Sequence, residues 1–345
     1  MYQIKSRKII QCLMFAFAGS MAAGTAFADT ATDARYEALA NGFIEKLLVT
    51  HPEAASAMGD HRYDSRSSDY SLHGVTVERA LYHRTLDQLA AIPAKDLSAD
   101  NAVDNAILQN ELHSRLFDIE VMNVPAREPL YYNPSQGLYI LLARDYAPLK
   151  QRLEAVNSRL QAIPTILAAA RKNLKTPPRV FTETAIKQNQ GAISLVKQEL
   201  DDYLKDEPGM RAKLAPARKR AIAALTAYGQ WLEHDLLPRS TGDFRIGKEN
   251  FRQKLHFALD SDLTPEQILS GAESELKNTQ QAMVETALPL YRQYFPDQPV
   301  EGVDGKIIVR KVLDKLAEAR SDNDTIVGKA KQKLAEATDF VRAHK

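Results

Sequence analysis

The stretch that decides the fold is residues 145–174, DYAPLKQRLEAVNSRLQAIPTILAAARKNL. Its large apolar side chains recur at steps of four, three, four, three and four residues, at Leu149, Leu153, Val156, Leu160, Ile163 and Leu167. This spacing places one apolar stripe along a helix, as in helices that pack against antiparallel neighbours. We therefore predict a long packed helix here, with a kink at Pro164.

The helical pattern extends over most of the chain. Residues 215–239 carry a second apolar series, made of Ile222, Leu225, Gly229, Leu232 and Leu236. Thr264, Pro265 and Gln267 form a helix-start signal, because threonine can cap, proline suits the first turn and glutamine completes a capping box. Alternation typical of strands is scarce, and no flexible linker occurs. We predict an all-α fold, a multi-helix bundle-like body of long antiparallel helices that is continuous along the chain.

The N-terminus has the three parts of a secretory signal peptide. Basic residues precede the apolar run of residues 9–28, which closes on the small-residue site Ala26-Phe27-Ala28 before Asp29. A membrane anchor is the alternative, but glycine, serine and threonine interrupt the run. We predict a signal peptide over residues 1–28, a mature helical domain over residues 29–345, and a periplasmic or secreted location in a bacterium.

Composition excludes several classes of protein. The single cysteine, Cys12, lies in the signal segment, so the mature chain has no disulfide, thiolate nucleophile or Cys-rich zinc site. The whole chain carries 45 basic and 44 acidic residues, and removing the signal leaves the balance slightly acidic. We therefore expect no nucleic-acid partner and no stable membrane insertion after signal cleavage.

Two motifs suggest ligand sites but fit them poorly. Residues 242–248, GDFRIGK, match the spacing of a phosphate-binding loop, yet Glu249 stands where a magnesium-binding serine or threonine is needed and no strand precedes the loop. Residues 60–73 contain Asp and His side chains of types that bind metals, without a rigid spacing. A turn before a short helix explains the first motif better. For the second, turn-forming aspartates and a metal site both remain open.

Three loops and one polar helix face are candidate functional surfaces. The loops are residues 59–76, 123–137 and 238–250. In the predicted helix around residues 181–196, Glu183, Lys187 and Gln190 share one face. That face is either solvated or the wall of a cleft.

The last nineteen residues, VGKAKQKLAEATDFVRAHK, predict an amphipathic helix whose apolar stripe has no evident partner. The stripe consists of Val327, Ala330, Leu334, Ala337, Phe340 and Val341. We expect it to pack on elements beyond Lys345 in a longer fold, or to associate with another molecule. The chain is then either a fragment or a shortened form.

Four segments together resemble a known family. They are GDHRYDSRSSDYS (59–71), the stretch 152–193, WLEHDLLPRSTGDFRIGKENFRQKL (231–255) and LTPEQILSGAESEL (263–276). In this order they resemble the N-terminal portion of the bacterial domain of unknown function 885 family, over residues 30–345. That family is similar to exported, helical zinc metallopeptidases that are longer than this chain.

The resemblance implies zinc held by a His-Glu-x-x-His helix and a downstream acid in the C-terminal part, with the motif glutamate as general base. This sequence contains no such motif. We therefore assign it no catalytic residue, metal ligand or cofactor of its own, and expect zinc only in a full-length relative. The fold is then an incomplete metallopeptidase-like fold, and whether the chain is an enzyme stays open.

Our first hypothesis is that the chain is the scaffold and cleft wall of an exported metallopeptidase-like protein, inactive by itself. Tyr131 and Tyr132, with Glu183 and Gln190, are the candidate contacts to a peptide substrate, because tyrosine donates hydrogen bonds and a polar stripe can hold a peptide backbone. The alternative is a non-enzymatic periplasmic binding protein that recruits a partner helix through its C-terminal stripe. A secreted metal-binding protein using residues 60–73 is the third possibility.

Overall fold

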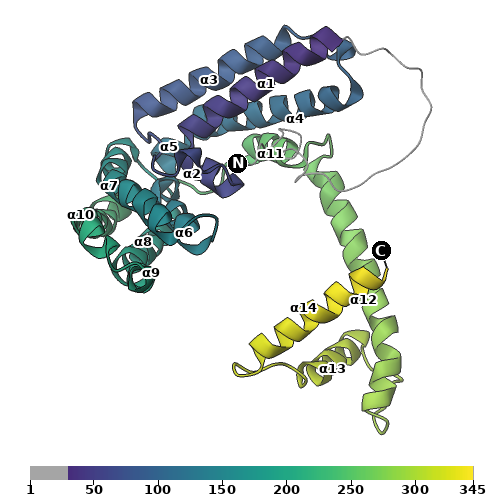
Figure 1. Ribbon diagram of the computed structural model, residues 1–345. Coiled ribbons are helices and arrows are strands. Elements are labelled where there is room, and N and C mark those ends of the chain that lie inside the picture. The colour runs from purple at the N-terminus through teal and green to yellow at the C-terminus, as the bar shows by residue number, and fades with distance from the viewer. Residues whose placement is uncertain (1–29, 345) are drawn as a thin grey trace. The chain divides into compact units, whose positions relative to one another are not determined.

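The computed structural model describes residues 30–344 (Figure 1). The predicted signal peptide, including Cys12 and the Ala26–Ala28 site, lies outside these residues. Within them the regular structure is helical, and the only strand-like pairing is an isolated bridge between Pro178 and Gly242. The all-α prediction is confirmed. No helix of the described part is long and apolar enough to cross a membrane.

The described residues form two compact units, unit 1 up to Asp260 and unit 2 from Ser261 on. The boundary has a local cause. Asp260 ends one helix in the left-handed conformation, with φ of 45°, and the capping box of Thr264 and Gln267 starts the next helix independently. Each unit also has its own apolar cluster, so a short connection suffices and no Gly/Ser-rich linker marks the division.

Unit 1 contains most of the helices. Its α-helices are α1 (Thr30–Thr50), α2 (Pro52–Met58), α3 (Leu72–Ala90), α4 (Ala99–Leu116), α5 (Val124–Arg127), α6 (Ser135–Ala143), α7 (Leu149–Asn173), α8 (Arg179–Ser194), α9 (Leu200–Asp206), α10 (Met210–Trp231) and α11 (Lys248–Leu259). Short 3₁₀ turns connect several of them, at η3 (His61–Tyr63), η4 (Ala94–Asp96), η6 (Pro129–Tyr132) and η9 (Leu237–Arg239). Single π-helical turns extend α4, α8 and α10, at η5 (Phe117–Val121), η7 (Leu195–Glu199) and η8 (Leu232–Leu236).

The predicted seam of α7 forms the centre of the larger core. Leu153, Leu160 and Ile163 are fully buried, and α7 packs against α10, whose Leu225 is also fully buried. Burial of each such side chain contributes about 1.5–3 kcal/mol. The helix runs on through Pro164 to Asn173. The apolar stripe of α7 is therefore buried against α10, as its spacing predicts, because both helices carry continuous apolar stripes.

A second core holds α1, α3 and α4 together, and in Figure 1 these three long helices lie side by side. Its buried side chains include Phe43, Tyr82 and Leu112. Phe43 and Tyr82 meet with ring centroids 6.2 Å apart. This core brings the C-terminal end of α1 beside α3, and that juxtaposition positions the site described below.

Unit 2 is thin. It consists of α12 (Pro265–Tyr294), α13 (Gly305–Ala317) and α14 (Ile326–Ala343), and its core is limited to Ala287, Tyr291, Ile308 and Val312. The predicted C-terminal amphipathic helix forms as α14, but none of its residues is buried. Leu334 is 69% exposed and Phe340 is 64% exposed, so the stripe has no apolar cover within the described residues.

Candidate functional site

Two of the three loops singled out in the sequence meet in unit 1, at a cluster of tyrosines. Tyr70 of loop 59–76 contacts Tyr131 edge to face, with ring centroids 5.2 Å apart. Tyr132 lies 5.0 Å from Tyr131 in the same geometry. Loop 238–250 contacts Pro177 through the backbone N–H of Gly242, at 3.2 Å, and reaches loop 123–137 only at Arg127, which donates to Asp243 O, so it lies away from the tyrosine cluster. The first two loops therefore form one surface.

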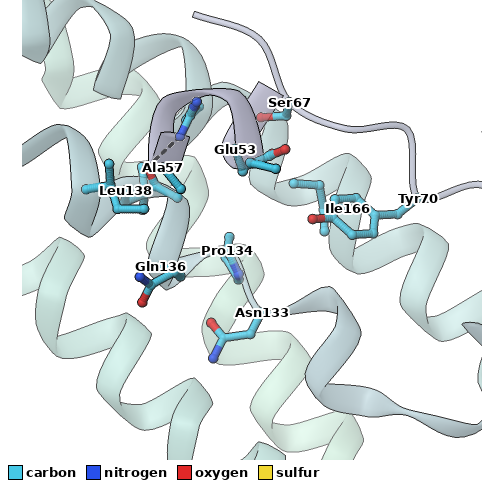
Figure 2. Close-up of a pocket in the computed structure, with 13 residues that line it drawn as sticks. Glu53, Ala57, Ser67, Tyr70, Asn133, Pro134, Gln136, Leu138 and Ile166 are labelled. Atoms are coloured by element: carbon cyan, nitrogen blue, oxygen red, sulfur yellow. Dashed lines mark hydrogen bonds between the residues drawn. The ribbon is translucent and has the colours of Figure 1, made fainter. Parts of the chain in front are cut away.

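Two cavities share Ser67 and Tyr70 as lining residues. The first, about 410 Å³, is here called the Tyr131 cavity and is lined by Val49, Thr50, His51, Arg66, Ser67, Ser68, Asp69, Tyr70, His73, Gly74, Val77, Glu78 and Tyr131. The second, about 250 Å³, is called the Glu53 cavity (Figure 2) and is lined by Glu53, Ala54, Ala57, Ser67, Tyr70, Asn133, Pro134, Gln136, Gly137, Leu138, Ile140, Arg159 and Ile166. The larger one has a volume in the range of ligand pockets.

A chain of polar contacts forms the back of the Tyr131 cavity. His51, between α1 and α2, places Nε2 3.1 Å from Oε1 of Glu78 on α3. The Tyr82 hydroxyl donates to the same carboxylate oxygen at 2.6 Å, and Arg115 of α4 donates to that hydroxyl at 3.4 Å. Three elements thus hold one half-buried carboxylate, and this carboxylate fixes the orientation of the histidine ring.

The electrostatics of this group follow from its burial and its partners. Burial by itself would raise the pKa of Glu78, but the hydrogen bond and charge of His51, with the Tyr82 hydrogen bond, outweigh it and lower the pKa. Glu78 is therefore an anion at neutral pH. Because Nε2 of His51 is engaged by Glu78, Nδ1 is the ring nitrogen that remains for a ligand.

Tyr131 contributes the other polar group of the cavity. Its ring is half-buried, and burial raises the pKa of its hydroxyl above the ordinary tyrosine value, so it is a neutral donor and acceptor. Among residues 30–344 its hydroxyl has no hydrogen-bond partner, and it is not sealed from solvent. The cavity therefore combines a held histidine with an uncommitted hydroxyl.

The Glu53 cavity is more firmly organised. The Glu53 carboxylate accepts hydrogen bonds from the Ser68 backbone N–H at 3.2 Å and the Ser68 hydroxyl at 2.5 Å. In Figure 2 Glu53 and Ser67 lie at one side of the cavity, and Asn133 and Gln136 at the other. Gly137 is required here, because a Cβ on it would come 2.8 Å from Cγ of Glu53.

The lining of this cavity includes a buried cation that the sequence analysis did not single out. Arg159 of α7 is only 3% exposed, and it donates to Gly137 O at 2.6 Å and to the Ser56 hydroxyl at 2.7 Å. The Ser56 hydroxyl in turn donates a hydrogen bond to Asp64, which also accepts one from the Tyr146 hydroxyl. This network fixes α2 and loop 59–76 against α7, because buried polar groups require partners.

The four predicted peptide contacts occupy different environments. Tyr131 lines the larger cavity, whereas Tyr132 is only 1% exposed and uses its hydroxyl to donate to Pro125 O and to accept from Asn173. Glu183 pairs with Arg179 at 2.8 Å on the exposed face of α8, and Gln190 is exposed on the same helix. Neither lines the two cavities.

The sequence also gave no signal for His51 and Glu78. They lie on different elements, separated by 27 positions, and only the packing of α1 on α3 brings them together. Neither belongs to a recognisable motif. Among the four predicted contacts, Tyr131 is the one that the structure places with these two residues.

The loop considered as a metal site uses its acids for other contacts. Asp60 accepts from Arg62, Asp64 lies 3.1 Å from Nδ1 of His61, and Asp69 accepts from the backbone of Ser71. Within residues 30–344 no group of three or more His, Cys, Asp or Glu side chains could hold a metal ion. The zinc that the family resemblance implies therefore finds no fitting ligand set in the described part of the chain.

The phosphate-loop match is a turn, as its context suggested. It follows the 3₁₀ turn η9, Gly247 has φ of 83°, and α11 begins at Lys248. The strand that a nucleotide-binding loop requires is absent from this part of unit 1. The interpretation as a loop before a short helix is confirmed.

Comparison with other proteins places this architecture among relatives. The family model described as "Bacterial protein of unknown function (DUF885)" matches residues 52–345. A solved structure described as "a putative lipoprotein of unknown function from Shewanella oneidensis" is similar, with a TM-score of 0.73 and 27% identity, over 89% of this chain and 57% of that one. The chain thus spans little more than half of that relative's length. No curated protein matches. Because the family model covers most of its length, the chain belongs to the DUF885 family of bacterial proteins of unknown function.

Proposed function

We propose that this chain is the ligand-binding, cleft-wall part of an exported, metallopeptidase-like protein, and that it holds a peptide in the Tyr131 cavity. The observation that carries the proposal is the convergence of His51, held by Glu78, and the uncommitted Tyr131 hydroxyl on one cavity of about 410 Å³. Both groups can hydrogen-bond to a neutral polar ligand.

A peptide suits this lining because its backbone alternates N–H donors and C=O acceptors. The Tyr131 hydroxyl can serve either group, and the hydroxyls of Ser67 and Ser68 lie on the same cavity. Val49 and Val77 provide apolar wall for a side chain. Tyr131 is thus retained as a peptide contact, whereas Tyr132 acts by supporting the loop behind it.

The chain's contribution to catalysis would be positional. Its described residues supply neither a zinc ligand set nor a His-Glu-x-x-His helix, so hydrolysis would require groups from the part of a longer relative that this chain does not match. Zinc would belong to that part. We therefore propose that the chain is inactive as a peptidase by itself.

The exported location is supported by two observations. Residues 1–28 have the organisation of a signal peptide, and the similar Shewanella protein is described as a lipoprotein. We propose that the mature chain works in the periplasm or outside the bacterial cell.

The test is peptide binding by isothermal titration calorimetry, using a panel of short peptides. Tyr131→Phe removes one hydroxyl and should weaken binding about five- to tenfold, as expected for one hydrogen bond. Tyr139→Phe is the matched control, because Tyr139 is 51% exposed on α6 and lines neither cavity. Absence of binding to every peptide, or equal losses in the two variants, would refute the proposal.

A second candidate function is favoured by α14. Its exposed stripe fits a non-enzymatic interaction role, in which a helix from the unmatched part of a longer family member packs on Leu334 and Val341. Co-expression with that part should give a complex that Leu334→Glu abolishes. Gln332→Glu, which adds the same charge on the opposite side of α14, should leave the complex intact. A complex that survives Leu334→Glu would exclude this surface.

A further inference from the structure

One end of the helix bundle in unit 1 carries an unbalanced group of cations. Arg239 donates from Nη1 to Lys175 O at 2.8 Å, the N–H of Gly242 donates to Pro177 O, and Arg127 donates to Asp243 O. These bonds join three stretches that are distant in sequence. The cations they gather, here called the basic face, are Arg127, Arg171, Lys172, Lys175, Arg179, Arg239 and Arg245.

Few carboxylates neutralise the basic face. Arg179 pairs with Glu183, and Arg245 lies 3.7 Å from Asp243. Residues 171–179 contain no acid at all. Glu128, next to Arg127, is half-buried, and burial raises the pKa of its carboxyl. Of the seven cations, Arg179 and Arg245 are paired with a carboxylate and Arg127 lies near Glu128, in a chain whose overall charge is close to zero.

Aromatic side chains accompany these charges. Arg171 and Arg239 both lie over the ring of Trp231, with guanidinium carbons 5.8 and 5.7 Å from its centroid. Phe244 in loop 238–250 is 53% exposed, and the guanidinium carbon of Arg245 lies 4.5 Å from the centroid of its ring. Cation–π contacts hold guanidinium groups in place. An exposed phenylalanine beside them is suited to bind where charged groups lie next to an apolar layer.

We propose that the basic face docks this protein on the anionic headgroups of a lipid bilayer, with Phe244 entering the interface. Charge complementarity selects the occupant, because phosphate-bearing headgroups attract clustered cations and the acyl boundary accepts the phenylalanine. The inference rests on the exported location in the proposed function, but it does not depend on the Tyr131 cavity. Binding is peripheral, since no helix of residues 30–344 can cross a membrane.

The experiment is co-sedimentation of the mature chain with vesicles of phosphatidylcholine, alone or mixed with phosphatidylglycerol. Binding is expected only to the mixed vesicles, and it should weaken as salt is raised. The triple variant Lys172→Gln, Lys175→Gln, Arg245→Gln should lower the partition coefficient about a hundredfold, at about fivefold for each cation. Phe244→Ser should lower it about tenfold.

The matched control is Lys213→Gln, Lys219→Gln, Arg220→Gln, which removes the same charge from exposed positions towards the N-terminal half of α10. It should bind like the wild type, and circular dichroism should show that both triple variants are folded. Three results would overturn the proposal: no binding to anionic vesicles, equal binding to neutral vesicles, or equal losses in the two triple variants. Peptide titrations of the Tyr131 cavity remain interpretable in each case, because they probe other residues.

Discussion

Replacing Arg159 by methionine tests whether the buried polar network holds unit 1 together. The side chain makes two short hydrogen bonds, to Gly137 O at 2.6 Å and to the Ser56 hydroxyl at 2.7 Å, and longer ones to Pro52 O and Arg66 O. Each short, charge-assisted bond contributes about 1.5–3 kcal/mol. Burial also penalises the guanidinium, as the lowered pKa of Arg159 shows, and methionine relieves that penalty. We expect a net loss of about 2–4 kcal/mol.

The assay is urea unfolding followed by the fluorescence of Trp231, the single tryptophan of the chain, which lies in unit 1 and reports on that unit. A loss of this size lowers the midpoint by about 0.7–2 M, for a slope of about 2–3 kcal/mol per molar urea. Arg179→Met is the control, because Arg179 is 63% exposed in an i,i+4 pair and should cost about 0.5 kcal/mol at most. An Arg159→Met midpoint within the error of the control would show that the network is dispensable and would refute this reasoning.

Three further predictions use the same unfolding assay. Tyr132→Phe should lower the free energy of unfolding by about 1–2 kcal/mol, because the Tyr132 hydroxyl has two hydrogen-bond partners. Tyr228→Phe should be close to neutral, because the buried Tyr228 hydroxyl has no partner among the described residues. Equal effects of the two changes would contradict these assignments. Gly137→Ala should destabilise by about 1–3 kcal/mol through its close contacts, while Gly191→Ala in open space on α8 should stabilise by about 0.5–1 kcal/mol; a tolerated alanine at the first site would exclude the close approach. Hydrogen bonds from two arginines lower the pKa of Asp201 to about 2, so its stabilising effect is present above about pH 4 and is lost as the pH falls towards 2. Asp201→Asn should flatten the acid side of the stability profile, and an unchanged slope would argue against this assignment.

The fold followed from the sequence where one helix face decides the outcome. The steps from Leu149 to Leu167 define the buried side of α7, and Thr264 with Gln267 defines the start of α12. The division into two units results from short loops and separate cores, and neither has a compositional signature. Local periodicity predicts helices, whereas the division of the helices between two units depends on tertiary contacts that periodicity does not show.

The site was predictable only in part, for related reasons. The loop containing Tyr131 was identified from its proline and tyrosine content, and the structure places it on a cavity. Tyr132 is turned inward because Pro125 O and Asn173 satisfy its hydroxyl there. Arg159 lies on the buried side of α7 because backbone carbonyls accept hydrogen bonds from its guanidinium group. A hydropathy pattern instead predicts that an arginine is exposed.

The uncovered surface of α14 has a thermodynamic consequence. With no buried residue, the 18 residues of α14 lack the tertiary packing from which most helical stability in proteins comes. We therefore expect its amide protons to exchange much faster than those of α7. A partner that covers Leu334 and Phe340 would have to order the helix as it binds, so affinity would be lower than the contact area suggests, and the heat capacity would fall markedly on association.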